Sequence, residues 1–229
     1  MKEVGRALYG SQNYLLADKE SDKDYKVFLC PSFEDLYRAH KADKNDLPKN
    51  LDSEHYSVLD ARKFAELVKV GNVNCLEYLF SLDLSGNDKF LNWCANARTL
   101  YHEGYLAVVW PTFFSSLTGM AKNSLDRYGV TRKSMSRAYF LYMFATTVVQ
   151  DHFCVWNSTW RNNRWNEVVH KMRFDDTTYL PTKEELFNSF KRLNVEATNR
   201  VKAYQVDPLY EQEKVLMEQM HNFVRMEVL

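Results

Sequence analysis

Two aspartates near the start of the chain are separated by a single residue, in the segment Ser21-Asp22-Lys23-Asp24-Tyr25. Side chains of a β-strand alternate between its two faces, so Asp22 and Asp24 would point the same way if this segment begins a strand. Two carboxylates on one face can share a divalent cation, which prefers oxygen ligands. Aspartate is also common in solvated turns, and the same segment is compatible with a turn that binds no metal.

Two short strands and the turn between them would position these acids. Residues 4–9 and 26–30 are rich in residue types that favour β-structure. Between them, Gly10 permits a positive φ, and Ser11 with residues 12–16 can begin a short helix whose free N–H groups attract an anion. The order of strand, Gly-Ser turn, short helix and acidic strand therefore predicts a phosphate site beside a metal site.

Three more motifs follow the acidic pair along the chain. They are Asp60-Ala61-Arg62-Lys63-Phe64, Gly71-Asn72-Val73-Asn74 and Leu76-Glu77-Tyr78-Leu79-Phe80. Together with Gly10-Ser11 and the Asp-x-Asp pair, they resemble the motifs of the DNA polymerase β-like nucleotidyltransferases. The closest resemblance is to small bacterial and phage members associated with RNA repair, and it covers Val4 to about Leu82 well and the remaining helical part loosely.

The resemblance implies an enzyme that moves a nucleoside monophosphate from a nucleoside triphosphate (NTP) to a hydroxyl acceptor and releases pyrophosphate. An RNA or tRNA 3′ end is the favoured acceptor. In this chemistry, Mg²⁺ (or Mn²⁺) ions held by three carboxylates neutralise the phosphates and activate the hydroxyl. Asp22 and Asp24 would bind the metal ions, while Gly10, Ser11 and Ser21 would contact the triphosphate.

The third carboxylate has two candidates, Asp60 and Glu54. If residues 54–60 form a strand, both acids lie on one of its faces, together with Tyr56 and Val58. Asp60 matches the acidic position that precedes Arg-Lys-Phe in the family, so the resemblance favours Asp60. Asp60 also directly precedes a predicted helix and would suit its N-cap, and Glu54 is the second candidate.

Basic residues of the C-terminal half offer further candidate phosphate contacts. Lys133 and Arg137 are four residues apart on a predicted helix over residues 131–148, and an ordinary solvated basic face is the alternative. In residues 156–173, tryptophans alternate with basic side chains, a pattern that can stack bases and hold phosphates. Such tryptophans are more often core residues with arginines at the rim. The side chains concerned are Trp160, Trp165, Arg161, Arg164, Lys171 and Arg173.

The motifs and the helical remainder predict an α+β protein. A small mixed sheet with flanking helices, the nucleotidyltransferase core, is expected over residues 1–85 and an all-α domain over residues 86–229. Family members usually carry a helix ahead of the Gly-Ser strand, whereas this chain starts almost at that strand. One face of the sheet is therefore expected to be less covered.

Apolar spacing and capping residues predict several helices. Residues 60–71 and 72–82 should form two of them, and Thr182 with Glu185 is a capping-box pattern at the start of another. A last helix is expected over residues 210–226. Within the second predicted helix, Glu77 can either reach the proposed site or lie on the surface.

Composition restricts the partners. Lys and Arg together number 30, as do Asp and Glu, so the formal net charge is zero and an RNA acceptor would need a local basic patch. The four cysteines form no Cys-x-x-Cys pair and no signal-peptide pattern opens the chain, so we expect reduced thiols and a cytoplasmic protein. The longest apolar stretch, residues 138–149, falls short of the roughly 20 residues of a membrane-spanning helix.

Three other functions are compatible with the sequence. The chain can be a catalytically silent nucleotidyltransferase fold that acts as a binding or antitoxin-like module, or an enzyme that adenylylates a protein. If the acidic pair is only a solvated turn, the chain is a helical interaction protein. No histidine is assigned a catalytic or metal-binding role, because none has partners at ligand spacing.

Overall fold

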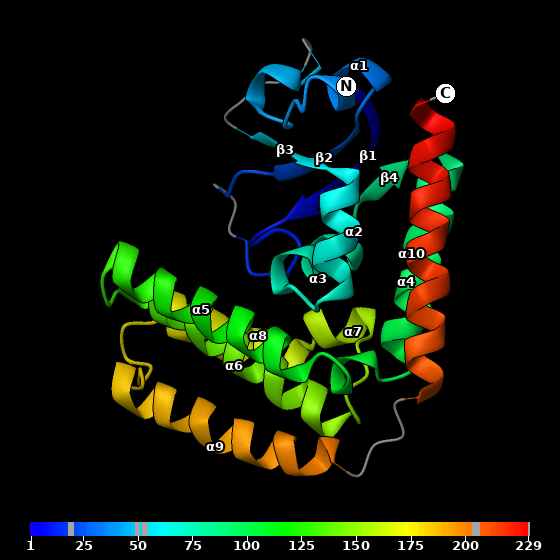
Figure 1. The fold of residues 1–229 in the computed structure, drawn as a ribbon. Helices are drawn as coiled ribbons and strands as arrows, with labels where there is room; N and C mark the ends of the chain where they lie inside the picture. Colours follow the sequence, from blue (N-terminus) through cyan, green and yellow to red (C-terminus); the bar gives the residue numbers. More distant parts are fainter. Residues whose placement is uncertain (18–20, 49–50, 52–54, 203–206, 229) are drawn as a thin grey trace. The chain divides into compact units, whose positions relative to one another are not determined.

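The computed structural model describes residues 1–17, 21–48, 51, 55–202 and 207–228, and it has the predicted α+β architecture (Figure 1). Contacts within the chain define two compact units. The first consists of Met1–Leu100 with Pro208–Leu229, and the second is Tyr101–Asp207. This division differs from the expected one after residue 85, because the contacts add most of the following helix and the last helix to the unit that contains the sheet.

The first unit is built on a four-stranded mixed sheet with the strand order β3-β2-β1-β4. The strands are β1 (Lys2–Tyr9), β2 (Asp24–Cys30), β3 (Tyr56–Asp60) and β4 (Leu84–Gly86). β1 is antiparallel to both β2 and β4, whereas β2 and β3 are parallel. Two short helices, α1 (Phe33–Tyr37) and the 3-10 helix η1 (Lys44–Asp46), lie in the connection from β2 to β3.

Helices α2 (Ala61–Lys69) and α3 (Val73–Leu79) pack on one face of this sheet. Phe28 of β2 is fully buried there, with its ring centroid 4.4 Å from that of Phe64 in α2 and 6.1 Å from that of Tyr78 in α3. Both helices begin at a polar side chain that caps the first turn, Asp60 for α2 and Asn72 for α3. The two helices predicted over residues 60–71 and 72–82 are thereby confirmed.

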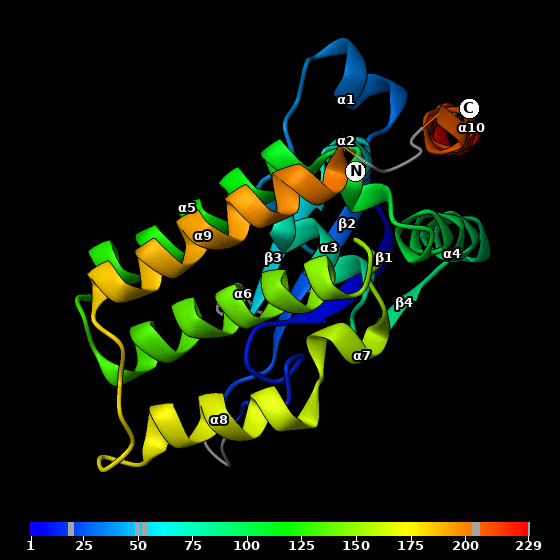
Figure 2. The ribbon, with the colours of Figure 1, turned by 90° about the horizontal axis from the view of Figure 1, so that it is seen from below.

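The last helix, α10 (Asp207–Val228), runs beside α4 (Asp88–His102) in the first unit (Figures 1 and 2). The indole N–H of Trp93 donates to the carbonyl of Leu216 at 3.0 Å. An ion pair at 2.8 Å also joins Lys69 of α2 to Glu213 of α10. The last helix of the chain is thus joined to both α4 and α2 of the first unit.

The second unit is a bundle of helices around α6 (Arg132–Gln150). Its neighbours are α5 (Trp110–Tyr128), α8 (Asn163–Phe174) and α9 (Lys183–Val201), and both Figure 2 and the contacts place α6 among them. The short helices η2 (Tyr105–Ala107) and α7 (Asn157–Trp160) complete the unit. Thr182 and Glu185 form the predicted capping box at the start of α9.

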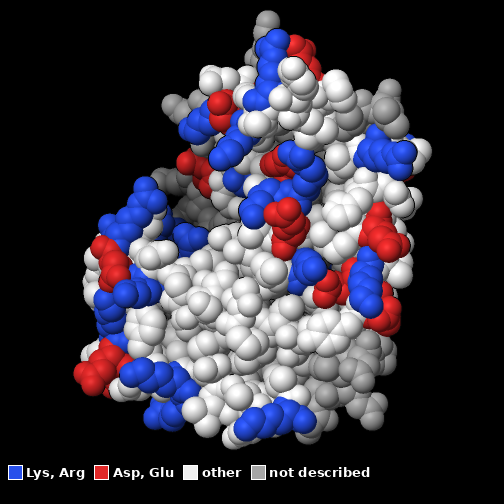
Figure 3. Space-filling model, in the orientation of Figure 1, with Lys and Arg blue, Asp and Glu red and all other residues white. Residues whose placement is uncertain are grey.

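No helix in the described part of the chain is long and apolar enough to cross a membrane. Over α2 and α10, on the face drawn in Figure 3, positively and negatively charged side chains are interspersed. This mixing agrees with a formal net charge of zero.

Candidate functional site

One end of the sheet brings the Gly-Ser turn next to the acidic strand. Tyr9, the last residue of β1, pairs with Asp24, the first residue of β2. Gly10 follows with φ of +80°, a conformation that favours glycine. A Cβ atom built on Gly10 would lie 3.8 Å from Oδ2 of Asp24, so the turn and this carboxylate are direct neighbours. Asp22 is exposed and lies just before β2.

The segment after Gly10 forms turns, whereas the sequence predicts a short helix. The N–H of Tyr14 donates to the carbonyl of Gly10 at 3.2 Å, and the N–H of Leu16 donates to that of Ser11 at 2.9 Å. Leu15 has φ of +60°, a left-handed conformation that interrupts helical hydrogen bonding. The expected helix N-terminus at Ser11 is therefore not formed, and any anion contact there would come from a turn.

Ser21 lies at the far end of the same loop. The side-chain amide of Gln12 donates to the carbonyl oxygen of Ser21 at 2.8 Å and so joins the beginning of the loop to its end. Residues 18–20 between them are outside the described residues. Ser11 and Ser21, the two serines proposed to contact a triphosphate, therefore belong to one closed loop at the Asp24 end of the sheet.

Glu77 of α3 fixes this loop from the helical side. Its side chain is buried, with the residue only 2% exposed, and one carboxylate oxygen accepts the N–H of Gly10. The carbonyl of Glu77 also accepts from the side-chain amide of Asn13 at 3.3 Å. Of the two positions that the sequence allowed for Glu77, the structure shows the one that reaches the Gly-Ser turn.

Asp60, the favoured third carboxylate, lies at the other end of the sheet. It pairs with Leu29, five residues beyond Asp24 along β2, which corresponds to about 16 Å of strand. Its carboxylate accepts the backbone N–H of Arg62 at 2.8 Å as the N-cap of α2, and it forms an ion pair with the Arg62 guanidinium. Asp60 is therefore not brought together with Asp22 and Asp24, because the parallel β3 carries its last residue away from the start of β2.

Strand register identifies the β3 residue that lies on the same face as Asp24 and Lys26. Tyr25 stacks on Tyr56, so these two side chains share the face that α2 and α3 do not cover. Asp24 and Lys26 then point to the opposite face, together with Ser57, which pairs with Lys26. On this face, the β3 residue beside Lys26 is thus a serine and not an acid.

These positions limit the metal site that the described residues can form. Among the residues that the structure describes, no group of three or more His, Cys, Asp and Glu side chains could hold a metal ion. Glu54, the second candidate, lies outside the described residues. A two-metal centre with three carboxylates is not formed by the described part of the sheet, where Asp22 and Asp24 are the two predicted ligands at this end.

Replacing Asp60 by alanine tests this assignment. Because Asp60 caps α2, we expect Asp60→Ala to lower the free energy of unfolding by about 1 kcal/mol, measured by urea denaturation. Asp60→Asn should remain close to the wild type, because asparagine caps a helix as well as aspartate does. Neither variant should lose nucleotide binding. If Asp60→Asn has normal stability but no longer binds a metal–nucleotide complex, Asp60 is a metal ligand and the assignment as a helix cap alone is wrong.

A cationic side chain that the sequence analysis did not single out lies beside Asp24. Lys26 is half-buried on the helix-covered face, and its Nζ lies 5.7 Å from the ring centroid of Tyr9 and 5.7 Å from that of Tyr78. Burial lowers the pKa of the Lys26 ammonium. In the sequence, strand alternation alone indicates that Lys26 shares a face with Asp24. The sequence does not indicate which face of the sheet the helices cover, so the burial of Lys26 could not be predicted.

Lys133 and Arg137 are both exposed on α6, in the second unit. The neighbouring Arg132 has a structural role, because its guanidinium donates to the carbonyls of Met172 and Thr178 at 3.1 and 3.2 Å. Arg132 thereby holds the end of α8 and the following turn against the start of α6. Lys133 and Arg137 remain the solvent-facing cations of that helix, in agreement with either of their two interpretations.

The aromatic and basic segment over residues 156–173 divides into core and rim. Trp160 is fully buried and stacks on Phe144 at a centroid distance of 3.9 Å, so it is a core residue and cannot stack on a base. Arg161 and Arg164 line a polar pocket of about 550 Å³ in the second unit. The remaining lining residues are Thr147, Gln150, Asp151, Ser158, Thr159 and Asn162.

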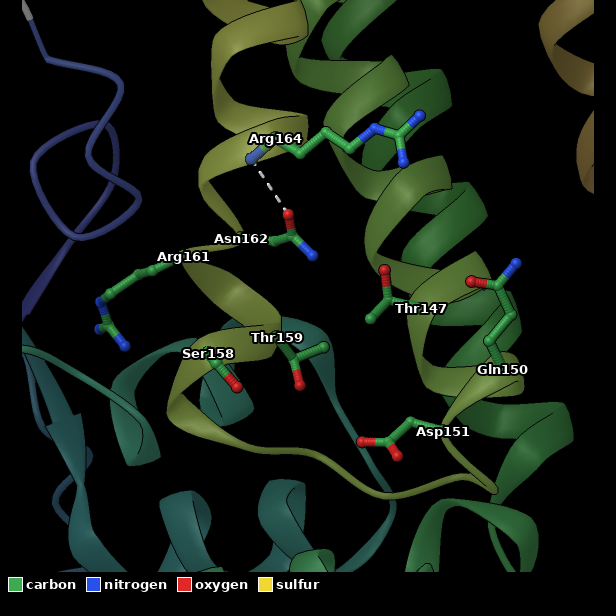
Figure 4. Close-up of a pocket in the computed structure, with 8 residues that line it drawn as sticks. All are labelled: Thr147, Gln150, Asp151, Ser158, Thr159, Arg161, Asn162 and Arg164. Carbon is green, nitrogen blue, oxygen red and sulfur yellow. Dashed lines mark hydrogen bonds between the residues drawn. The ribbon is translucent and has the colours of Figure 1, made fainter.

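Figure 4 shows how the side chains of this pocket lie. Thr147, Asp151 and Thr159 border its open space, while the guanidinium of Arg161 extends away from it. Asn162 caps α8, with its side-chain oxygen accepting the N–H of Arg164 at 3.1 Å. The pocket therefore presents hydroxyl and amide groups with an acid at its edge, a lining without the concentrated positive charge that a triphosphate needs.

Comparison with known proteins identifies no relative: no family model, curated protein or solved structure matches the chain. The fold and the residues at the Asp24 end of the sheet therefore carry the functional argument.

Proposed function

We propose that the chain is a nucleotidyltransferase of the DNA polymerase β-like kind, which binds an NTP at the Asp24 end of the sheet. One observation carries this proposal. The Gly10 turn and the Asp24 carboxylate are direct neighbours, with Asp22 two residues before Asp24 on the incoming chain. A glycine turn lets a polyphosphate approach the backbone, and neighbouring carboxylates can hold the cation that accompanies a polyphosphate.

Each residue at this end has a role in the proposed reaction. Asp22 and Asp24 would hold Mg²⁺ or Mn²⁺, which when bound would neutralise phosphate charge and make the acceptor hydroxyl more acidic. Gly10, Ser11 and Ser21 would orient the triphosphate through the closed loop, and Glu77 would keep that loop in place. The acceptor oxygen would form a bond to the α-phosphorus. The bond between the α-phosphorus and the oxygen that bridges to the β-phosphate would break, so that pyrophosphate leaves.

The acceptor is proposed to be an RNA or tRNA 3′ end. A ribose hydroxyl, like the hydroxyl of a protein side chain, meets the chemical requirement of the reaction, so a protein is the alternative acceptor. Within the second unit, the exposed Lys133 and Arg137 and the pocket-lining Arg164 stay candidate phosphate contacts.

A second candidate is nucleotide binding without transfer, as a regulatory or antitoxin-like module. Two specific observations favour it. The β3 residue on the face that Asp24 shares is Ser57, which pairs with Lys26, and Asp60 is engaged as a helix cap about 16 Å of strand away. A site with fewer carboxylates than the two-metal mechanism uses can still bind a metal–nucleotide complex.

Label transfer from nucleotides distinguishes the two candidates. The protein is incubated with each α-³²P-labelled NTP and with separate RNA and protein fractions, in the presence of Mg²⁺ or Mn²⁺ or of EDTA. We expect metal-dependent labelling of the RNA fraction. Labelling of protein alone would replace the RNA acceptor by a protein acceptor. Metal-dependent binding without labelling would favour the silent module. If the protein shows no binding and no labelling, the proposed nucleotide site is overturned.

A further inference from the structure

Lys26 carries a positive charge into the partly buried region next to Asp24. Asp24, Lys26 and Phe28 alternate along β2 and therefore share one face. The helices cover this face at Phe28, and their cover thins toward the Asp24 end, where Lys26 is half-buried. The ammonium of Lys26 lies against the ring of Tyr9, which directly precedes the Gly10 turn.

No carboxylate in the described part of the chain forms an ion pair with Lys26. Among the described groups near its ammonium are the rings of Tyr9 and Tyr78, which approach each other edge to face at 5.5 Å, and the thiol-bearing Cys75. Aromatic rings attract a cation but leave its charge uncompensated. A half-buried charge of this kind costs folding free energy unless an anion binds to it.

Ser57 explains why the charge remains available. It pairs with Lys26 across the parallel strands, and its Oγ lies 3.5 Å from the hydroxyl of Tyr9. An aspartate at this position would lie beside Lys26, on the face that Asp24 shares, and could either add a metal ligand or neutralise Lys26. A serine does neither, so the site combines the Asp22–Asp24 pair with a lysine in place of a third acid.

We propose that the ammonium of Lys26 binds the phosphate oxygens of the nucleotide, where it supplies the positive charge of one of the two metal ions that such sites otherwise use. This inference rests on the proposed nucleotide site and adds to it a phosphate-binding residue and a reduced requirement for metal. An ammonium donates up to three hydrogen bonds to phosphate oxygens, and hydrogen bonds between charged groups are the strong ones.

Calorimetric titration of the full chain with ATP, GTP, CTP, UTP and inorganic tripolyphosphate tests the proposal, with and without Mg²⁺. We expect the wild type to bind at least one of these ligands, and Lys26→Met to weaken that binding about 10-fold to 100-fold. Lys23→Met is the matched control, because Lys23 is an exposed lysine of the same segment and should bind as the wild type does. If the protein binds tripolyphosphate but no nucleotide, the ligand of the site is a polyphosphate and not a nucleotide.

The thermal unfolding of Lys26→Met separates a binding role from a structural one. Methionine retains most of the aliphatic length and removes the uncompensated charge, so the Tm should stay the same or rise. A lower Tm together with unchanged ligand affinity would show that Lys26 serves packing only, and would overturn the inference.

Ser57→Asp provides a second, independent test at the same place. The new carboxylate should neutralise Lys26 and weaken nucleotide binding in the absence of Mg²⁺. In the double variant with Lys26→Met, the same carboxylate should restore binding in a strictly Mg²⁺-dependent form. If the wild type binds none of the ligands, the proposed function fails; if the wild type binds and Lys26→Met binds equally well, only the role of Lys26 fails.

Discussion

Asp24→Ala is expected to reduce nucleotidyl transfer by a factor of at least about 100, with the fold intact. Asp24 is the acid that adjoins the Gly10 turn, so its removal takes away both a cation ligand and the charge that places the cation beside the triphosphate. Loss of a single preorganised charge-stabilising group lowers catalytic rates by factors of about 10² to 10³. The rate of label transfer at saturating Mg²⁺ measures the effect.

Stability should barely change in this variant. Asp24 begins β2 and is half-exposed, and substitutions at such positions usually alter the free energy of unfolding by less than about 0.5 kcal/mol. The control is Asp83→Asn, since Asp83 is an acid near the same end of the sheet. Asp83 accepts the hydroxyl of Tyr25 at 2.8 Å and, with burial, raises the pKa of Tyr25 to about 12. Equal loss of transfer in both variants would show that the effect is one of general charge and not of Asp24 itself.

Glu77→Ala should both destabilise the first unit and weaken nucleotide binding. The substitution removes the carboxylate that accepts the N–H of Gly10, and it also removes the buried methylene groups of the Glu77 side chain. Together these losses should lower the free energy of unfolding by about 2 to 4 kcal/mol. Without the hydrogen bond to Glu77, the Gly10 turn is no longer held in place. We therefore expect the affinity for a nucleotide to fall under conditions where the variant is still folded. Urea denaturation and calorimetric titration measure the two effects separately.

Glu77→Gln distinguishes the positioning role from a need for negative charge. The glutamine side-chain oxygen can accept the same N–H, so this variant should regain most of the stability and of the nucleotide affinity. Glu77 contacts the turn and is expected to act through it. A Gln variant that is stable but does not bind nucleotide would indicate instead that the Glu77 carboxylate meets the ligand or its metal directly.

Local features of the fold could be predicted from sequence because they depend on neighbouring residues. The capping box at Thr182 and the helix that begins after Asp60 both follow from short-range hydrogen bonds between a side chain and the next turn. The strand at Asp24 and the turn at Gly10 follow from residue type in the same way. From these features, the α+β class and the proximity of Asp24 to Gly10 could be predicted.

Long-range geometry could not be predicted in this way. Whether Asp60 reaches Asp24 depends on the direction and register of β3 against β2, which no local pattern encodes. The Asp60 side chain suits a metal ligand and a helix cap equally well, and only the parallel pairing decides between them. Lys26 and Glu77 are similar cases, because their importance depends on which face of the sheet the helices cover.

The discontinuous first unit has a consequence for synthesis of the protein. Trp93 and Lys69 contact Leu216 and Glu213 of α10, more than a hundred residues further along the chain. As a ribosome adds residues one at a time, the bundle of residues 101–207 emerges whole while the sheet still lacks its final helix. The first unit would thus be completed only after the second unit has emerged, when α10 can contact α2 and α4.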